Sequence, residues 1–306
     1  MNVLVTGSTG FIGTALVKAL INEKYNVYCL IRNKSIINTN KENIIRLKDN
    51  SIESFKLALQ SRKFDFIINL ASYGVRRGDS DLNTMIDGNV NFLANLICSL
   101  TEKPKMIINV GSCSEYGFIG EGKYVDESTP LAPVTLYGAA KSATTLFGNT
   151  LAILHDVKLI SLRLFGVYGE GEADYRLLPY LVNNLNNNES VELTSGEQQR
   201  DVLYIDDIVN AFLCAINKYE NIPSNSSYNV CSGVPVRVKD FVEYIALKMN
   251  KSVDLLKWGV IDRPDEPEWL VGSNELFKRY TDWEPQFDMK SGLDKAVISI
   301  LKDPQD

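Results

Sequence analysis

The first thirteen residues contain the feature that most limits how this chain can fold. A short run of buried-strand character, Val3 to Thr6, leads into Gly7, and glycine returns at Gly10 and Gly13 as a helical apolar pattern begins. Glycine permits positive φ and lets another group approach the bare backbone. The unpaired N–H groups at the start of a helix suit a pyrophosphate. The sequence therefore predicts a strand, a tight turn and a helix that bind a dinucleotide, although the spacing is GxxGxxG rather than GxGxxG.

Beyond this turn, strand and helix patterns alternate along the chain. Apolar runs predict strands at residues 26–31, 43–47, 65–70, 105–110 and 158–164. Helical periodicity predicts helices at residues 11–20, 52–61, 82–100 and 136–155. This alternation is typical of an α/β fold with a doubly wound, Rossmann-type parallel sheet, whose ligands bind at the carboxyl ends of the strands.

Composition excludes several classes of function. The chain has 306 residues, of which 45% are hydrophobic, and a net charge of −6 with no basic cluster, so nucleic acid is not an expected partner. The longest apolar runs are strand-sized and no signal peptide precedes the first strand, so we expect a cytoplasmic protein without a membrane span. The five cysteines have no close pairing, which predicts neither a disulfide framework nor a metal site.

The residue after the second predicted strand bears on the choice of cofactor. In this architecture an acid at that position accepts the ribose 2′-OH of NAD, whereas an arginine accommodates the 2′-phosphate of NADP. Here the predicted strand ends at Ile31, and Arg32, Asn33 and Lys34 come directly after it. Arg32 therefore favours NADP(H), with NAD(H) as the alternative. A solvated surface arginine is the competing interpretation.

Two later segments place hydroxyl groups and a lysine near the same sheet edge. Small residues end one strand at Leu70, Ala71 and Ser72, and Ser112 ends the next. Tyr137 and Lys141 are four residues apart and so share one helix face. An ammonium near a phenol can lower the pKa of the phenol and make an acid–base pair, although the two residues could equally form a surface contact.

Taken together, these motifs resemble the extended short-chain dehydrogenases/reductases, in the NAD(P)-dependent nucleotide-sugar epimerase/dehydratase family. The resemblance covers nearly the whole chain. The matching segments are residues 6–13, residues 70–72, Asn89, Ser112 with Tyr116 and Gly117, Tyr137 with Lys141, RLFGVYG at 163–169, RDVLYIDD at 200–207, and Arg263 with Pro264.

The resemblance implies roles for these residues. Tyr137 would be the catalytic acid/base, Lys141 would hold the nicotinamide ribose and lower the pKa of Tyr137, and Ser112 would bond the reacting sugar oxygen. The implied cofactor-binding residues are Gly7, Ser8, Thr9, Gly10, Phe11, Ile12, Gly13, Arg32, Asn33, Lys34, Asp49, Leu70, Ala71, Ser72, Asn89, Tyr137, Lys141, Phe165 and Val167. The implied substrate-binding residues are Tyr73, Ser112, Ser114, Arg200 and Arg263.

The resemblance also implies an organisation. Residues 1–165, rejoined by about 204–232, would form the NAD(P)-binding domain, and residues 166–203 and 233–306 a smaller C-terminal α/β substrate lobe. Arg200 and Arg263 would converge on the diphosphate of a nucleoside-diphosphate sugar. Structural salt bridges, such as Arg200 with Asp201 or Arg263 with Asp265, are the alternative for these arginines. Two helices per subunit, one after Gly88 and one bearing Tyr137, would form a four-helix bundle in a homodimer.

The residues after Ser112 separate the reactions of the family. Family dehydratases typically carry Asp and Glu at the two positions that are Cys113 and Ser114 here, so dehydration is disfavoured. Because Arg32 favours NADPH, we predict reduction of the C4 keto group of a nucleoside-diphosphate 4-keto-6-deoxy sugar, with Tyr137 as proton donor. An NAD-dependent C4 or C2 epimerase is the alternative, followed by a non-catalytic NADP-sensing protein.

Overall fold

The computed structural model describes residues 1–32, 43–76, 78–264 and 266–302. Its largest element is a seven-stranded sheet with the order β12-β7-β5-β4-β1-β2-β3, in which every neighbouring pair is parallel. The strands are β1 (Asn2–Thr6), β2 (Asn26–Arg32), β3 (Ile44–Leu47), β4 (Phe66–Asn69), β5 (Met106–Ser112), β7 (Leu159–Leu164) and β12 (Ser226–Val230). The predicted doubly wound parallel sheet is therefore confirmed.

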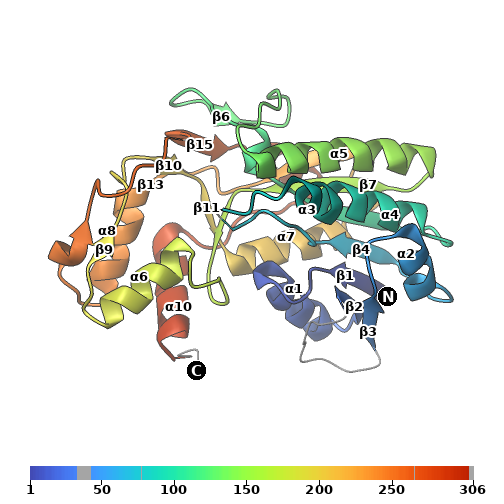
Figure 1. Ribbon diagram of the computed structural model, residues 1–306, viewed down its shortest axis with the longest axis horizontal. Helices are drawn as coiled ribbons and strands as arrows, with labels where there is room; N and C mark the ends of the chain where they lie inside the picture. The colour runs from blue at the N-terminus through green and yellow to red at the C-terminus, as the bar shows by residue number, and fades with distance from the viewer. Residues whose placement is uncertain (33–42, 77, 265, 303–306) are drawn as a thin grey trace.

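Alternate residues of these strands pack against helices on opposite faces of the sheet. Val3 and Val5 of β1 belong to a core with α1 (Phe11–Asn22) and α7 (Ile205–Asn217), whereas Leu4 belongs to a second core. That second core is formed with α2 (Ile52–Leu59), α4 (Phe92–Cys98) and α5 (Leu136–Leu154) (Figure 1). Because both faces are covered, the strands are apolar throughout rather than alternating.

A smaller part, at the left of Figure 1, is built from short strands and helices. This part contains a four-stranded sheet with the order β13-β10-β15-β6 and two strand pairs, β11-β8 and β14-β9. Their bounds are β6 (Tyr124–Val125), β8 (Gly166–Tyr168), β9 (Val191–Glu192), β10 (Gln199–Arg200), β11 (Val202–Tyr204), β13 (Val236–Arg237), β14 (Leu256–Lys257) and β15 (Trp269–Gly272). The helices of this part are α6 (Leu177–Asn186), α8 (Val238–Lys248) and α10 (Met289–Lys302), whereas α9 (Glu275–Thr281) packs against β12 of the large sheet. No helix in the described ranges is both long and apolar enough to cross a membrane.

One predicted helix differs in the structure. Residues 82–100 were expected to form a single α-helix, but α3 (Leu82–Ile86) and α4 are joined by a π-helical turn over Asp87–Asn91. The Asn89 side-chain amide donates to the Met85 carbonyl oxygen at 2.8 Å. In an α-helix that oxygen would accept from the Asn89 main-chain N–H. The side-chain bond is a local reason for the wider turn, a feature frequently found at functional sites.

A buried ion pair fixes the carboxyl end of β5. The Arg163 Nε donates to Glu115 Oε2 at 2.9 Å, and both residues are at most 5% exposed. Glu115 Oε1 accepts from the Ser112 main-chain N–H at 2.9 Å. Arg163 Nη1 also donates to the Tyr116 hydroxyl, which donates to Asn229 Oδ1 of β12. This network holds the turn after β5 against β7 and β12.

Glu115→Gln tests how much the fold depends on that pair. Glutamine keeps an acceptor oxygen but leaves the buried Arg163 charge uncompensated, and breaking one partner of such a pair costs about 3–5 kcal/mol. We expect a loss of that size in the free energy of unfolding, measured by urea denaturation at neutral pH. The matched control is Glu102→Gln, which removes an exposed pair with Lys63 and should change stability little. Equal effects of the two variants would contradict a structural role for Glu115.

Candidate functional site

The glycine turn lies directly against the end of β4. Gly7 has a φ of 63°, and a Cβ there would lie 2.7 Å from the Leu70 carbonyl carbon. A Cβ on Gly13 would lie 2.1 Å from the Gly7 carbonyl oxygen, so both positions require glycine. Gly10, the N-cap of α1, makes no side-chain cap hydrogen bond. The first N–H groups of α1 can therefore receive a pyrophosphate.

The other predicted residues of this turn surround the same helix end. Ser8 is buried, Thr9 is exposed, and Phe11 and Ile12 are half-buried in the first turn of α1. The Ala71 main-chain N–H donates to Thr6 Oγ1 at 3.1 Å, which ties the end of β4 to the end of β1. Leu70 and Ala71 thus form one wall beside the glycine turn.

The residues predicted for the adenosine end lie at the carboxyl ends of β2 and β3. Arg32 ends β2 and is exposed. Asp49 follows β3 and accepts hydrogen bonds at Oδ1 from the Ser51 and Ser54 hydroxyls, which lower the pKa of Asp49 to about 2. Asp49 is therefore ionised and held at the start of α2. Asn33 and Lys34 lie outside the described residues.

Asn89 holds the segment after β4 in place. Its Oδ1 accepts from the Ser72 hydroxyl at 2.8 Å, and its Nδ2 donates to the Tyr73 carbonyl oxygen at 3.0 Å. Tyr73 is half-buried, and a Cβ on the following Gly74 would lie 3.4 Å from the Tyr137 ring. The π-helical turn thus positions Ser72 and Tyr73 beside Tyr137.

Close packing brings the start of α5 onto the turn after β5. Thr135 caps α5 by accepting from the Gly138 main-chain N–H at 3.0 Å. A Cβ on Gly138 would lie 2.3 Å from the Ser114 carbonyl oxygen, so glycine is needed for this approach. The Ser112 hydroxyl accepts from the Ser114 main-chain N–H at 3.1 Å. Ser112, Ser114 and Tyr137 therefore lie together at one edge of the sheet.

The protein environment keeps the Tyr137 phenol protonated at neutral pH. Burial raises the pKa of Tyr137 to about 12, and hydrogen bonding to the Ser112 and Ser72 hydroxyls opposes that rise. Ser72, predicted as a cofactor contact, is thus also a neighbour of the phenol. A protonated phenol with two hydroxyl neighbours can donate a proton to an oxygen that gains negative charge.

Lys141 has two neighbours that bear on its predicted effect on Tyr137. Lys141 does lie near the phenol ring, with Nζ 5.9 Å from the ring centroid. However, Nζ donates to the Val110 carbonyl oxygen at 2.9 Å, and burial lowers the pKa of Lys141 to about 8 while Glu115 opposes that change. In the chain by itself, desolvation of Tyr137 therefore outweighs any acidifying effect of the lysine, and the pKa of Tyr137 is raised rather than lowered.

The two arginines predicted for the substrate diphosphate converge on one carboxylate. Arg200 Nη2 lies 3.4 Å from Glu266 Oε2, and Arg263 Nη1 lies 2.8 Å from Glu266 Oε1. Structural salt bridges were the alternative for these arginines, and the structure shows one from each arginine to Glu266. Asp265 lies outside the described residues. Two guanidinium forks at one place can bind a diphosphate.

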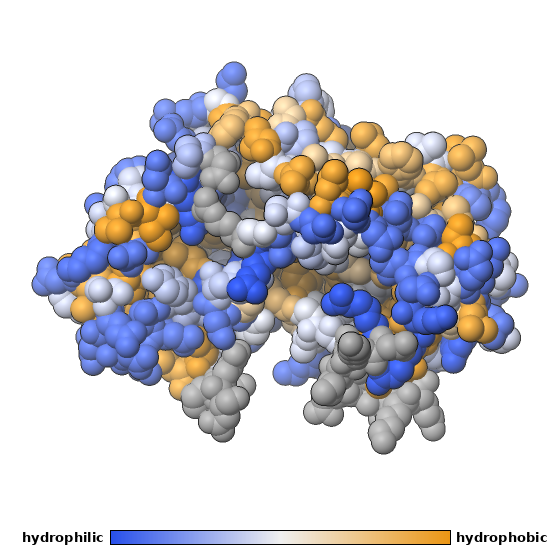
Figure 2. Space-filling view, viewed as in Figure 1, coloured by the Kyte–Doolittle hydropathy of each residue, from blue (hydrophilic) through white to orange (hydrophobic). Residues whose placement is uncertain are grey.

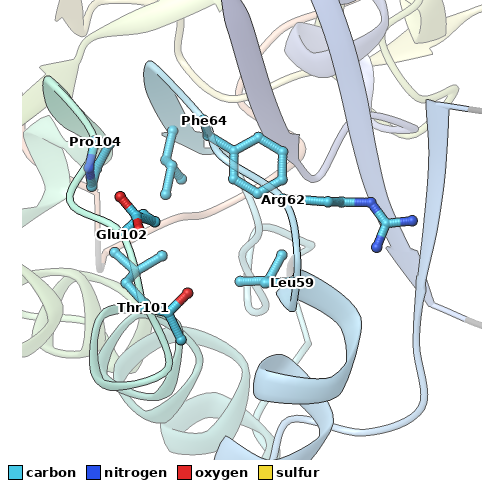
Figure 3. A pocket seen from close by; sticks show the side chains of 8 residues that line it. Leu59, Arg62, Phe64, Thr101, Glu102 and Pro104 are labelled. Carbon is cyan, nitrogen blue, oxygen red and sulfur yellow. The ribbon is translucent and has the colours of Figure 1, made fainter.

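The remaining predicted residues follow β7. Phe165 is buried and its main-chain N–H donates to the Val230 carbonyl oxygen at 3.1 Å, and Val167 lies in β8 beside β11. Figure 2 shows the surface hollowed between the part with the large sheet and the part with α6, α8 and α10. A different hollow, lined by Leu59, Phe64 and Pro104 at the start of β4 and β5, has a volume of about 10 Å³ and could hold at most one water molecule (Figure 3).

Several residues that shape the site were not identified from the sequence. The contacts of Glu115 with Arg163 and of Glu266 with Arg200 join distant parts of the chain, which no local pattern reports. A buried ladder also crosses four strands, with Thr6 bonded to Asn69, Asn69 to Asn109 and Asn109 to Ser161. A polar residue within each of these otherwise apolar strands was the signal that could have indicated this ladder.

Comparison with known proteins adds independent information. The model of the NAD dependent epimerase/dehydratase family matches residues 3–231. The CDP-abequose synthase of Salmonella typhimurium is 28% identical over 96% of this chain and 97% of its own. The dTDP-4-dehydro-6-deoxyglucose reductase of Escherichia coli is 25% identical over 97% of each chain. The crystal structure of Bacillus anthracis dTDP-glucose 4,6-dehydratase in complex with NAD superposes with a TM-score of 0.85, at 23% identity over 99% of this chain and 97% of that one.

The lowered pKa of Lys141 predicts a pH-dependent contribution to stability. Its value of about 8 lies below the ordinary 10.5, so between these pH values the unfolded chain binds the proton more tightly than the folded chain does. The free energy of unfolding contributed by Lys141 therefore increases as the pH rises through this interval. We expect the wild type to gain stability relative to Lys141→Met from pH 8 to 10.5, measured by urea denaturation. A stability difference that does not change with pH would contradict the lowered pKa.

Proposed function

Because this chain belongs to the NAD dependent epimerase/dehydratase family, we propose that it reduces the C4 keto group of a nucleoside-diphosphate 4-keto-6-deoxy sugar with NADPH. The observation that carries the proposal is the grouping of Ser112, Ser72 and a protonated Tyr137 at the sheet edge beside the glycine turn. The similarity to dTDP-4-dehydro-6-deoxyglucose reductase supports it.

The chemistry at the sugar follows from the groups present. When bound, NADPH supplies a hydride to the carbonyl carbon. Negative charge then develops on the carbonyl oxygen, and the Ser112 hydroxyl donates a hydrogen bond to that oxygen while the Tyr137 phenol gives it a proton. A phenol with a pKa of about 12 is protonated at neutral pH and can act as the acid that reduction needs.

The identity of the cofactor rests on Arg32. Its exposed guanidinium at the end of β2 can pair with a 2′-phosphate, and this favours NADPH over NADH. The bound NAD in the dehydratase structure belongs to that protein. The substrate diphosphate would lie on the forks of Arg200 and Arg263, which Glu266 already holds side by side.

Tyr137→Phe tests the reaction. The purified protein is mixed with CDP-, dTDP-, UDP- or GDP-4-keto-6-deoxy sugars, and oxidation of NADPH and of NADH is followed by absorbance. We expect one of these sugars to be reduced faster with NADPH. Tyr137→Phe should lower turnover by about 10²–10⁴-fold, because the proton donor is lost. NADPH binding, followed by fluorescence, should be retained.

The control for this variant is Tyr25→Phe, which removes a hydroxyl that bonds Asn217 far from the site. It should leave turnover unchanged. Inversion at C4 without NADPH oxidation, together with NAD released on denaturation, would establish the epimerase instead. A Tyr137→Phe variant with full turnover would contradict Tyr137 as the proton donor. NADPH binding without turnover of any of these sugars would leave a cofactor-sensing protein as the remaining interpretation.

We also propose that the protein is a homodimer through α5 and the helix pair α3–α4. α5 exposes Leu146, Phe147 and Leu154 by 59%, 58% and 74%, and α3 exposes Leu82. Figure 2 shows apolar side chains gathered over this face. A second copy that presents the same two helices would cover this apolar stripe and complete a four-helix bundle.

A paired substitution tests the dimer. Leu146→Glu with Phe147→Glu places charges in the proposed bundle and should convert a dimer to a monomer in analytical ultracentrifugation. The control is Leu247→Glu, since Leu247 is 70% exposed on α8 in the other part of the molecule. A monomeric wild type at micromolar concentration, or dissociation by the control alone, would contradict this interface.

A further inference from the structure

Asp201 is a buried carboxylate surrounded by hydrogen-bond donors. It is 1% exposed. Its Oδ1 accepts from the main-chain N–H and the hydroxyl of Ser232 at 2.7 and 2.8 Å. Its Oδ2 accepts from the N–H groups of Gly233 and Gly272 at 2.9 and 3.3 Å. All four contacts are hydrogen-bond donors, and a carboxylate, which only accepts, is the side chain that suits them.

These donors come from both parts of the molecule. Ser232 and Gly233 follow β12, an edge strand of the large sheet, whereas Gly272 ends β15 of the four-stranded sheet. The main chain of Asp201 makes hydrogen bonds to β15 and to β8. Its N–H donates to the Leu270 carbonyl oxygen at 3.1 Å, and its carbonyl oxygen accepts from the Gly166 N–H at 2.9 Å. The Asp201 side chain therefore makes hydrogen bonds to both parts of the molecule.

The groups proposed to act on substrate lie immediately beside this junction. Arg200 precedes Asp201 and pairs with Leu270 and Val236 in the four-stranded sheet. On the other side, the Cys113 thiol, which follows Ser112, lies close enough to sense the charges of both Asp201 and Arg200. The turn that follows Ser112 and the Arg200 guanidinium thus both lie near the Asp201 carboxylate.

We propose that Asp201 is a positioning residue that sets the place of the Arg200 guanidinium relative to the catalytic turn at Ser112. The inference rests on the proposed function, because it takes Arg200 as a residue that binds the substrate diphosphate. Asp201 touches no substrate itself. It acts by holding β10 and β15 at a fixed distance from the ends of β5 and β12, so that a sugar bound by its diphosphate reaches Tyr137.

Asp201→Asn changes this junction with the smallest change of shape. An amide NH₂ would face N–H donors and repel at least one of them, so β10 would shift and carry Arg200 with it. Misplacement of a binding group by about 1 Å can cost up to about 100-fold. We expect the KM for the nucleotide sugar, and the Kd for the matching nucleoside diphosphate, to rise roughly tenfold or more. The Kd for NADPH should not change, because the glycine turn makes none of these contacts.

A double-mutant cycle separates positioning from general damage to the fold. Kd values for CDP, UDP, dTDP and GDP are measured by calorimetry for the wild type, Asp201→Asn, Arg200→Ala and the double variant. If Asp201 acts through Arg200, Asp201→Asn weakens binding in the wild type and adds nothing in the Arg200→Ala background. Equal losses in both backgrounds, or a parallel loss of NADPH binding, would overturn the inference.

Ser232→Ala is the milder test, because it removes one hydroxyl donor and keeps the Ser232 N–H. It should weaken nucleoside-diphosphate binding less than Asp201→Asn does, again only where Arg200 is present. The matched control is Ser128→Ala, which removes a similar hydroxyl bond to the Asp126 carboxylate at 2.6 Å on the surface. The control should have no effect on binding.

Failure of the inference differs from failure of the proposed function. If Arg200→Ala weakens nucleoside-diphosphate binding and the effect of Asp201→Asn is additive to it, the positioning role of Asp201 is wrong, whereas the diphosphate role of Arg200 is supported. If Arg200→Ala leaves the binding of all four nucleotides unchanged, the diphosphate role of Arg200 and the positioning role of Asp201 fall together.

Discussion

The candidate site depends most on the buried carboxylate of Glu115. It accepts hydrogen bonds from the Ser112 N–H, from Arg163 on β7 and, at 3.5 Å, from Thr145 on α5. Ser112 belongs to β5, and Thr145 belongs to α5, which also carries Tyr137 and Lys141. The same charge opposes the loss of the Lys141 proton. One acid therefore fixes the geometry of the catalytic edge and keeps a cation near it, which a neutral side chain could not do.

Much of the fold could be predicted because it is encoded by local pattern. The apolar strands, the glycine turn and the helical spacing of Tyr137 and Lys141 each depend on neighbouring residues, and the structure places them as expected. The break in the helix at residues 87–91 could not be foreseen, because it depends on the contacts of Asn89 with Met85 and Tyr73. Glu115 and Asp201 resemble surface acids in the sequence, and only distant partners show that they are buried.

The acidity of Tyr137 shows why a motif does not determine a pKa. Spacing correctly places Lys141 near the phenol, but the sequence does not show that the amine points to the Val110 carbonyl oxygen or that both side chains are desolvated. Desolvation disfavours each charged form, and so it raises the pKa of the phenol and lowers that of the amine. At its ordinary pKa of 10.0 the phenol is already neutral at neutral pH, and desolvation keeps it so.

The two positions after Ser112 extend this argument to the choice of reaction. Burial and the nearby Asp201 raise the pKa of the Cys113 thiol to about 12, so it is uncharged at neutral pH, and Ser114 carries no charge either. An Asp–Glu pair at these positions would add two carboxylates beside Glu115 and Asp201, and it would supply a second acid and base for elimination of water. Here Cys113 and Ser114 offer neither. Under the proposed function, Tyr137 delivers the one proton that reduction requires, whereas elimination of water would need a further acid and base.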